Sequence, residues 1–538
     1  MFSLQQMLRV LFSCEYNPTW LCFYEVFPSF KQDFSVQQRL VLCCFSLLAI
    51  INAYTMRLCL DLSLKRIVLE GCARPPTPPP PQHAAAKIHH WLTELAARLN
   101  ETENMLRERL RAGREHVYHP TKMPLAAIKQ PVKLPSRESL KVSSRERISC
   151  SELWSRQTQT LVTVAFYAGY MLTHIPGGRL SERCGGKWIL GAAIIFSAIL
   201  TLLTPLAVRH GGPYALMAVR LGIGLCEGPT FPAVSAMLAQ WIPEEERGLL
   251  ASGVLSGGEI GITLVQLLSG LVMAEEDWPV AFYVVGGGAV AWFLGFILIC
   301  HSKPDNCPYI QSEERDYIKS HVSATLLVAA DNAEGQQPPN APWRSILMST
   351  PLWALVSASM QHDWSRQQFG QELQQVLEEL RARGSTLWDE LEASIVVTAP
   401  YIGNWLASLS TGTLSDYLIA EQLLSRTETR RLMSWLVFVC GSMYMVHLKS
   451  DGARIWRVLA VGAYYAGIKL LPLDMSPNYA GTLMGISNGM GALPGLLLPY
   501  LQEFEADYAI VGSVRSALWL ICSAYISAEV QSYNQPQG

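Results

Sequence analysis

The chain has 538 residues, of which 50% are hydrophobic and only 16% are charged, and its formal net charge is −2. A typical globular protein contains roughly 25% charged residues, so this composition fits either a large multidomain soluble enzyme or a membrane protein with polar insertions. The net charge argues against a nucleic-acid-binding protein, which needs a basic surface. The 13 cysteines are scattered through the chain, which excludes a small disulfide-bonded scaffold.

Twelve apolar segments of about 20 residues decide between these alternatives, because that length crosses a hydrocarbon core of about 30 Å. Apolar helices of soluble proteins are usually shorter and apolar on one side only. The sequence therefore predicts an all-α polytopic membrane protein with twelve transmembrane helices. In chain order the segments cover about 39–62, 158–178, 188–208, 214–241, 249–273, 279–300, 346–364, 394–414, 432–448, 455–473, 479–501 and 511–528.

Two polar insertions divide the chain. The segment 301–344 separates six spans from six, which predicts two six-helix halves, and the longer segment 70–153 follows the first span. The predicted organisation is a cytoplasmic N-terminal segment (1–38), an N-terminal half (39–300) that includes the large loop 70–153, a central cytoplasmic loop (301–344), a C-terminal half (345–530) and a cytoplasmic tail (531–538).

The distribution of basic residues predicts how the helices are oriented. The turns after the second and the eighth spans are basic, whereas the turn after the fifth span is acidic. Short cytoplasmic loops are rich in Lys and Arg, so we expect both termini in the cytoplasm and the 70–153 loop on the extracellular or lumenal side. The many basic residues of this loop do not oppose the assignment, because long loops translocate largely regardless of charge.

The large loop carries two features suited to the outer side. Asn100-Glu101-Thr102 is an N-glycosylation acceptor pattern, although it lies within a helical stripe of leucines, where modification is less efficient. Cys72 and Cys150 lie at the two ends of the loop. A disulfide between them would close a long loop, an effect on the order of 4 kcal/mol in the chain-entropy model, and two free thiols are the alternative.

The most specific local pattern follows the second span and reads Gly178-Arg-Leu-Ser-Glu182-Arg183-Cys-Gly-Gly186-Lys187. A shorter version, Gly412-Thr-Leu-Ser-Asp416, follows the eighth span, at the matching place in the second half. Glycines let two helix ends approach closely, and the charged residues can form ion pairs in one conformation and break them in another. A tight turn is the alternative, but the repetition predicts a pair of gating loops in two related halves.

The first of these loops resembles the loop signature of the major facilitator superfamily. In the fourth span, the run Arg220-Leu-Gly-Ile-Gly-Leu-Cys-Glu227-Gly-Pro-Thr-Phe-Pro232 resembles the matching helix of the anion:cation symporter family, which contains sodium–phosphate cotransporters, sialin and the vesicular glutamate transporters. The segment Asn52-Ala-Tyr54-Thr-Met-Arg57 in the first span also matches that family. The resemblance covers about 36–62 and 154–534, and is closest to the insect-type inorganic phosphate cotransporters.

The resemblance implies a secondary active transporter that moves an anion by alternating access and is coupled to Na⁺ or H⁺. The anion would be inorganic phosphate or a small organic anion such as glutamate or sialate. No enzyme activity, cofactor, metal or nucleic-acid partner is implied, and we expect a monomer in the lipid bilayer of the plasma membrane or of a lysosome or vesicle. A transport-impaired relative that acts as a receptor or scaffold is the alternative.

Charged residues inside a membrane are costly, and they therefore mark candidate functional sites. Arg57 and Arg220 lie in predicted spans, and the resemblance implies that both face the substrate anion, together with Tyr54. Snorkelling of Arg57 to the outer surface or an ion pair of Arg220 with a nearby carboxylate is the alternative. Lys469 either adds positive charge to the same site or reaches the cytoplasmic surface.

Three ionisable residues are candidates for ion or proton coupling. Glu227 lies seven residues beyond Arg220, two helical turns along the same face. Glu259 lies among glycines in the fifth span, where the family often has an uncharged polar residue. His362 could titrate near physiological pH, or it could cap a helix end.

The seventh span departs most from the family. Many members place an arginine where this chain reads His362-Asp363-Trp364, and a charged run begins directly after it. The span is therefore expected to be short or tilted, and we interpret 370–392 as a solvated amphipathic helix. Vesicular members carry histidines where this chain has Thr163 and Ser235, which argues against a glutamate-type mechanism.

Overall fold

The computed structural model describes residues 37–73, 154–274, 278–322, 341–383, 387–446 and 453–501. The chain forms two compact units, one of residues 1–68 and 154–538 and the other of residues 69–153. Asn100, Cys150 and the side chain of Cys72 lie outside the described residues. The glycosylation site and the disulfide therefore stay predictions, and the description that follows concerns the first unit.

We use "N-terminal half" for the helices α3 to α11. A break inside α7 marks the turn between two predicted spans: Gly212 has a positive φ of 60°, a conformation that favours glycine, and Pro213 follows it. The helices of this half are α3 (Gln38–Ala73), α6 (Arg156–Cys184), α7 (Gly186–Glu227), α8 (Thr230–Trp241), α9 (Arg247–Leu255), α10 (Gly257–Ala274) and α11 (Trp278–Ile299).

We use "C-terminal half" for the helices α15 to α21. Short elements, η3 (Pro304–Asn306), α12 (Ser312–His321) and α14 (Trp343–Leu347), lie between the halves in the chain. The helices of the C-terminal half are α15 (Thr350–Arg383), α16 (Leu387–Ala420), α17 (Arg426–Val446), α18 (Ala453–Ala466), η4 (Ile468–Leu470), α19 (Leu471–Met475), η5 (Pro477–Tyr479), α20 (Ala480–Gly491) and α21 (Leu493–Leu501).

The prediction of an all-α fold is confirmed, because the regular elements of the described residues are helices and no strand occurs among them. Eleven of the twelve predicted spans coincide with described helices, and the twelfth, 511–528, lies outside them. Within the described residues, five stretches are long and apolar enough to cross a membrane by length and composition alone: Gln38–Leu60, Gly186–Trp241, Arg247–Leu268, Trp278–Ile299 and Arg454–Met475.

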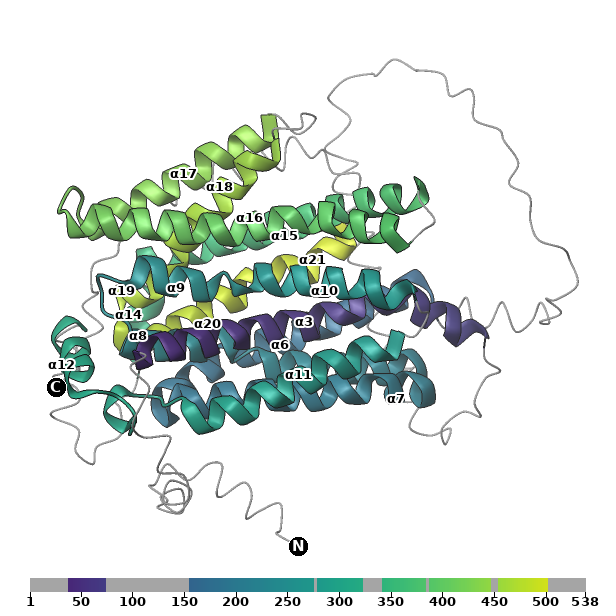
Figure 1. Cartoon of the computed structure of the whole chain (residues 1–538), viewed down its shortest axis with the longest axis horizontal. Coiled ribbons are helices and arrows are strands. Elements are labelled where there is room, and N and C mark those ends of the chain that lie inside the picture. The colour runs from purple at the N-terminus through teal and green to yellow at the C-terminus, as the bar shows by residue number, and fades with distance from the viewer. Residues whose placement is uncertain are drawn as a thin grey trace, which may run out of the picture. The chain divides into compact units, whose positions relative to one another are not determined.

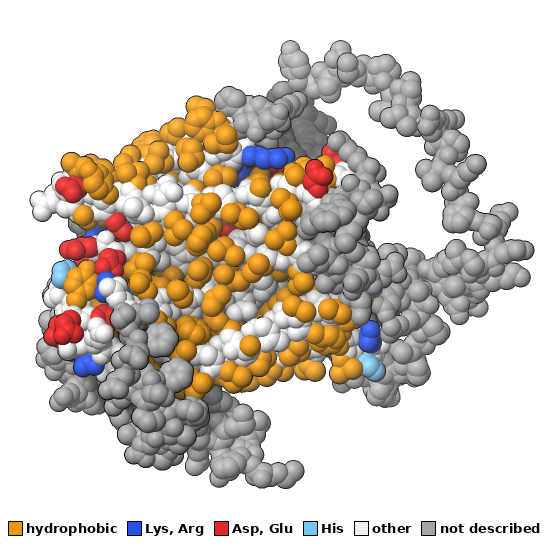
Figure 2. Space-filling model, viewed as in Figure 1, with side chains coloured by type: hydrophobic (Ala, Val, Ile, Leu, Met, Phe, Trp, Pro, Cys, Tyr) orange, Lys and Arg blue, Asp and Glu red, His pale blue; other side chains and the backbone are white. Residues whose placement is uncertain are grey.

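Hydrophobic side chains cover the middle of the face shown in Figure 2, whereas charged residues gather toward its two ends. Leu172, Leu294 and Leu406 on α6, α11 and α16 are 69%, 58% and 52% exposed. Soluble proteins rarely expose such a large continuous apolar surface. This surface therefore matches the hydrocarbon core of a bilayer.

The seventh span differs from its prediction. α15 continues without a break through the charged run to Arg383, and Phe369, Leu373 and Leu377 on it are 3%, 2% and 1% exposed. These three residues repeat every four positions and therefore lie on one helix face, while the charged residues lie on the others. The predicted amphipathic character is thus present in the part that α15 covers, but this part continues the seventh span rather than forming a separate helix after it.

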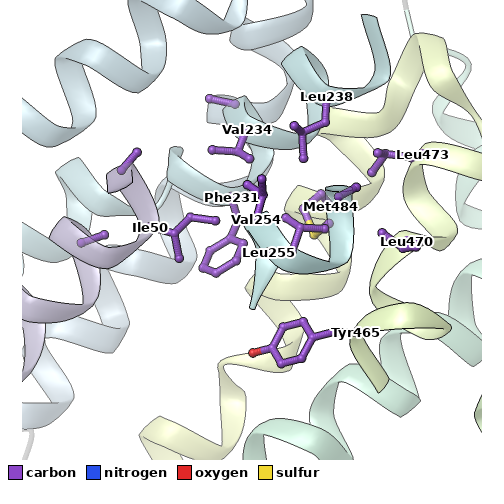
Figure 3. Packing of buried hydrophobic residues seen from close by; sticks show 14 of the residues in the cluster. Ile50, Phe231, Val234, Leu238, Val254, Leu255, Tyr465, Leu470, Leu473 and Met484 are labelled. Atoms are coloured by element: carbon purple, nitrogen blue, oxygen red, sulfur yellow. The ribbon is translucent and has the colours of Figure 1, made fainter. Parts of the chain in front are cut away.

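The two halves meet around two helices of the C-terminal half: α6 and α8 pack against α20, and α9 and α10 pack against α16. The helices run side by side in Figure 1, with α9, α10, α20 and α21 in the middle of the bundle. Figure 3 shows Phe231 and Leu255 of the N-terminal half clustered near Met484 of the C-terminal half. Because lipid is as apolar as leucine, such contacts depend on close packing rather than on the hydrophobic effect.

Candidate functional site

A small cavity of about 20 Å³ lies between the two halves. It holds roughly one water molecule, which needs about 10–15 Å³, so a solute requires the cavity to widen. The lining is aromatic and charged rather than aliphatic. Its residues are Tyr54, Arg57, Tyr167, Tyr170 and Phe231 from the N-terminal half, and His362, Asp363, Arg366, Gln367, Tyr465, Lys469, Asn488 and Ala492 from the C-terminal half.

Arg57 of α3 is 6% exposed and is enclosed by aromatic rings. Its guanidinium carbon lies 4.8 Å from the ring centroid of Phe166 and 4.6 Å from that of Tyr167. A desolvated cation–π contact of this kind contributes about 2 kcal/mol. The guanidinium donates no hydrogen bond to any other described residue, so its donors are available to a ligand in the cavity.

Arg220 of α7 has a different position from the one expected. It is buried, but it is not among the residues that line the cavity. Its Nη1 donates a hydrogen bond of 2.8 Å to the backbone carbonyl of Arg57. Arg220 therefore holds the backbone of α3 where Arg57 is presented to the cavity.

Glu227 lies at the end of α7 and is 2% exposed. Its Oε1 has no hydrogen-bond partner among the described residues. Arg57 and Arg220 are the cations that act on it electrostatically. A buried carboxylate with an unsatisfied oxygen is costly while it is ionised, which suits a group that takes up a proton or a cation.

Lys469 lies in η4 and lines the cavity rather than reaching the surface, with 8% of the residue exposed. Its Nζ donates a hydrogen bond to Oδ1 of Asn488 and lies 4.8 Å from the ring centroid of Phe231. Tyr54 is shared by the two halves, because its ring lies 5.8 Å from the guanidinium of Arg57 and 5.5 Å from that of Arg366.

His362 forms part of the cavity wall on α15. Its imidazole stacks on the ring of Tyr464, with centroids 3.6 Å apart and planes only 3° from parallel. The neighbouring Asp363 forms an ion pair of 3.4 Å with Arg366. Sequence reasoning missed Arg366 because it lies in the charged run after Trp364, although its spacing of four residues from His362 places both on one helix face.

Glu259 of α10 does not line the cavity. It accepts a hydrogen bond of 2.8 Å from Nδ2 of Asn404 on α16, so it joins the two halves. Arg366 and Arg457 act on it electrostatically. Glu259 is therefore placed where a change in its charge would act on the contact between α10 and α16.

The two predicted gating loops make matching contacts with the opposite half. Glu182, at the end of α6, accepts hydrogen bonds of 2.6 Å and 2.8 Å from the backbone N–H and the hydroxyl of Thr482 at the start of α20. Asp416, near the end of α16, accepts hydrogen bonds of 2.7 Å from the backbone N–H groups of Gly248 and Leu249 at the start of α9. Each carboxylate therefore caps a helix N-terminus of the other half.

Glycines allow these contacts. A Cβ on Gly178 would lie 2.2 Å from the carbonyl oxygen of Gly481, and one on Gly412 would lie 2.3 Å from that of Gly248. Any other residue at either position would push the halves apart. Burial raises the pKa of Glu182 to about 7 and that of Asp416 to about 6, against the opposing effect of the hydrogen bonds that each accepts.

The other residues of the first gating loop remain within their own half or on its surface. Gly186 begins α7, where a Cβ would lie 2.4 Å from Cγ of Met237 on α8. The backbone N–H of Lys187 donates to the hydroxyl of Ser302, and its Nζ lies 5.5 Å from the ring of Trp188. Arg183 is exposed.

A second charged contact joins the halves beside these loops. Asp474 of α19 is fully buried and pairs with Arg247 of α9 at 3.4 Å and with Arg430 of α17 at 2.8 Å. Glu244, which precedes α9, pairs with Arg426 of α17. Arg426 and Arg430 belong to the basic turn after the eighth span, and their pairing cannot be predicted from the sequence because their partners lie far away in it.

Comparison with known proteins places these features in context. The Major Facilitator Superfamily model matches residues 123–499. A protein named as an inorganic phosphate cotransporter in Drosophila melanogaster is 29% identical over 408 residues, covering 71% of this chain and 75% of that protein. Human sialin is 30% identical over 376 residues, covering 68% and 73%, and human vesicular glutamate transporter 2 is 28% identical over 409 residues, covering 71% and 67%.

The fold is also similar to that of a solved structure. The proton:xylose symporter XylE, bound to 6-bromo-6-deoxy-D-glucose, superposes with a TM-score of 0.55 and covers 91% of this chain and 97% of its own. The sequence identity is 11%, so this likeness concerns the fold alone.

Proposed function

We propose that this chain, which belongs to the major facilitator superfamily, is a secondary active transporter of a small anion. The observation that carries the proposal is a buried arginine, Arg57, whose guanidinium lines a cavity between the halves and has no carboxylate partner among the described residues. A buried cation of this kind is costly unless a ligand neutralises it. Relatives named as phosphate cotransporter, sialin and vesicular glutamate transporter support an anionic ligand.

Transport proceeds by alternating access, in which the N-terminal half (39–300) and the C-terminal half (345–530) rock about the cavity. The contacts of Glu182 and Asp416 close the side that the basic loops assign to the cytoplasm. Opening that side requires both helix caps to break, together with the Asp474 contacts. In this account the gating loops control access, and Arg57, Lys469 and Tyr54 hold the anion, while Arg220 positions Arg57.

The driving ion is Na⁺ or H⁺, and Glu227 is the leading residue for its coupling. Its Oε1 lacks a hydrogen-bond partner, and its charge acts on the two arginines at and behind the cavity. Glu259 and His362 are the other candidates, the first at the contact between the halves and the second in the cavity wall.

The protein is an integral membrane protein, since it has the fold and the apolar surface of its family. A vesicular membrane agrees with the name of the vesicular glutamate transporters, and a lysosomal membrane or the plasma membrane is the alternative. Both termini lie in the cytoplasm, the 70–153 loop faces the other side, and the protein acts as a monomer.

The alternative is a transport-impaired receptor or scaffold that acts through the 70–153 loop, most of which lies outside the described residues, and the polar seventh span favoured it. α15 is continuous, buries an apolar stripe and brings its charged residues His362, Asp363 and Arg366 to the cavity. The polar character of this helix therefore supports a ligand site, and the scaffold hypothesis has no feature of its own in the described residues.

Uptake into proteoliposomes tests the proposal. Purified protein is reconstituted, and uptake of phosphate, glutamate and sialate is measured with an inward sodium gradient, with a proton gradient, and with neither. We expect saturable uptake of at least one anion, accelerated by one of the two gradients. Uptake of none of the three, from protein that is correctly inserted, would contradict the proposal.

A further inference from the structure

Arg366 of α15 has the properties of a ligand-binding residue. It lines the cavity, its side chain is only 12% exposed, and its Nε donates to Oδ1 of Asp363 at 3.4 Å. Its two terminal Nη groups make no hydrogen bond with another described residue. Since a guanidinium recognises carboxylate and phosphate groups through two parallel N–H donors, the unused edge of Arg366 suits an anion.

Arg57 and Arg366 face the same ring from opposite halves. Their guanidinium carbons lie 5.8 Å and 5.5 Å from the ring centroid of Tyr54. Arg57 comes from α3 in the N-terminal half, and Arg366 comes from α15 in the C-terminal half. An anion bound between the two arginines would therefore contact both halves at once.

Asp363 is the only carboxylate among the described residues that line the cavity. Its contact with Arg366, at 3.4 Å, is longer than the 2.7–2.9 Å of a strong charge-assisted hydrogen bond. The side chain of Asp363 is also 25% exposed. Asp363 thus neutralises Arg366 through a weak contact that a better anion can replace.

The charges around the cavity do not balance. Three cations and one carboxylate line the cavity, in the part of the chain that the structure describes, which leaves two positive charges when all are ionised. The cations are Arg57, Arg366 and Lys469, and the carboxylate is Asp363.

We propose that Arg366 binds the transported anion, that Asp363 holds Arg366 in the empty cavity as an internal competitor, and that the site takes a dianion. This inference rests on the proposed function. The charge excess of two matches one dianion, such as hydrogen phosphate or a dicarboxylate, whereas a monocarboxylate leaves one positive charge uncompensated. The unused donors of Arg57 and Arg366 match the several oxygens of such an anion.

The test compares four probes on purified full-length protein: phosphate, sulfate, glutarate and butanoate. Binding is measured as the probe concentration that gives half of the maximal rise in melting temperature. We expect a dianion to reach this point at a concentration at least tenfold below that of butanoate. The probe with the lowest half-effective concentration shows whether the site prefers a tetrahedral dianion or a dicarboxylate. A half-effective concentration of butanoate equal to that of the dianions overturns the dianion assignment.

Two variants test the residues. Asp363→Asn removes the competitor and should lower the half-effective concentration of the strongest probe about fivefold. Arg366→Gln should raise this concentration at least tenfold. Arg366→Lys keeps the charge but loses the paired donors, so its half-effective concentration should lie between those of the wild type and Arg366→Gln. Glu379→Gln and Arg344→Gln remove exposed charges on α15 and α14 and should bind as the wild type does.

The outcomes separate this inference from the proposed function. Should no anion stabilise the wild-type protein or enter proteoliposomes, the proposed function itself fails. Should the wild type bind anions while Asp363→Asn binds them equally or more weakly, or Arg366→Gln binds them equally, the proposed function stands and this inference is wrong. If Arg366→Gln does not fold, Asp363→Asn decides alone, because it leaves Arg366 in place.

Discussion

Arg57 and Arg430 are both buried arginines, but only one of them has carboxylate partners in the described structure. Arg430 binds Asp474 and donates to the hydroxyl of Ser415, whereas the guanidinium of Arg57 contacts only aromatic rings. The contacts of Arg430 are those of a residue that stabilises the fold. A buried charge without a salt-bridge partner contributes less to stability than a paired one, so a ligand explains Arg57 better than a structural role does.

This contrast predicts unequal effects on stability. Arg57→Gln should lower the melting temperature in detergent much less than Arg430→Gln does, because it loses contacts with aromatic rings but breaks no salt bridge among the described residues. Arg430→Gln should lower it strongly, since breaking a buried pair costs about 3–5 kcal/mol. Differential scanning fluorimetry of the two variants side by side measures the difference, and an Arg57→Gln protein that is as unstable as Arg430→Gln would show a structural role for Arg57.

Glu227 supports a prediction about coupling. Glu227→Gln keeps the size of the side chain but removes its charge, so the protein can no longer bind and release the driving cation there. We expect uptake by this variant to lose its dependence on the sodium or proton gradient while exchange of labelled for unlabelled anion persists. Coupling that is unaltered in Glu227→Gln would assign the role to Glu259 or His362.

At the scale of elements, the helix caps decide which side of the protein is closed. The carboxylates of Glu182 and Asp416 each satisfy N–H groups at a helix start in the opposite half. Loss of a cap to alanine costs typically about 1 kcal/mol, and tenfold in an equilibrium corresponds to about 1.4 kcal/mol. Each cap therefore shifts the balance between closed and open states about fivefold.

Spin labels can measure that shift. Labels replace the exposed residues Arg183 and Glu421, at the ends of α6 and α16, and pulsed electron resonance records the distance between them. We expect Glu182→Ala and Asp416→Ala each to enlarge the population at longer distance, and the double variant to enlarge it further. A distance distribution that is the same in all four proteins would contradict the gating role.

The raised pKa values of the same carboxyl groups predict a pH dependence. Their ordinary pKa values are 4.5 and 3.8, and burial in the closed state raises them to about 7 for Glu182 and about 6 for Asp416. The closed state thus binds protons more tightly than the open state, so closure is favoured at low pH. This advantage is complete below the ordinary values and is lost as the pH rises toward 7.

The same pair of spin labels tests this sign. The closed population should fall as the pH is raised from 4 to 8, with most of the change between pH 4.5 and 7. The double variant Glu182→Gln/Asp416→Asn cannot titrate at either position and should show a flat profile. A closed population that rises with pH, or an equal slope in the double variant, would contradict the assignment.

The gating loops also show what sequence alone can and cannot predict. The pattern from Gly178 to Lys187 identified the loop because the glycines and charges are local in sequence. Its main partner, Thr482, lies 300 residues away, and no local pattern contains that pairing. Arg366 cannot be recognised from hydropathy for a different reason, because α15 is long but polar on one face, so its apolar stretch ends before this residue.

At the scale of the whole molecule, the bundle is a pair of halves that meet around one cationic cavity. The all-α fold and the positions of eleven spans followed from hydropathy, because each span needs about 20 apolar residues. The position of Arg220 could not be predicted from hydropathy, because the direction of its side chain depends on how α7 packs on α3. At one end the two halves are joined by polar contacts, the caps of Glu182 and Asp416 and the Asp474 pairs, which suits a structure that opens and closes there.

The central claim is that the cavity between the halves carries an anion through Arg57. The most direct measurement is the initial rate of anion uptake into proteoliposomes that contain equal amounts of wild-type or Arg57→Gln protein, under the gradient that drives the wild type. The account predicts saturable uptake by the wild type and a loss of at least tenfold in the variant, which remains folded. Undiminished uptake by a folded Arg57→Gln protein would contradict it.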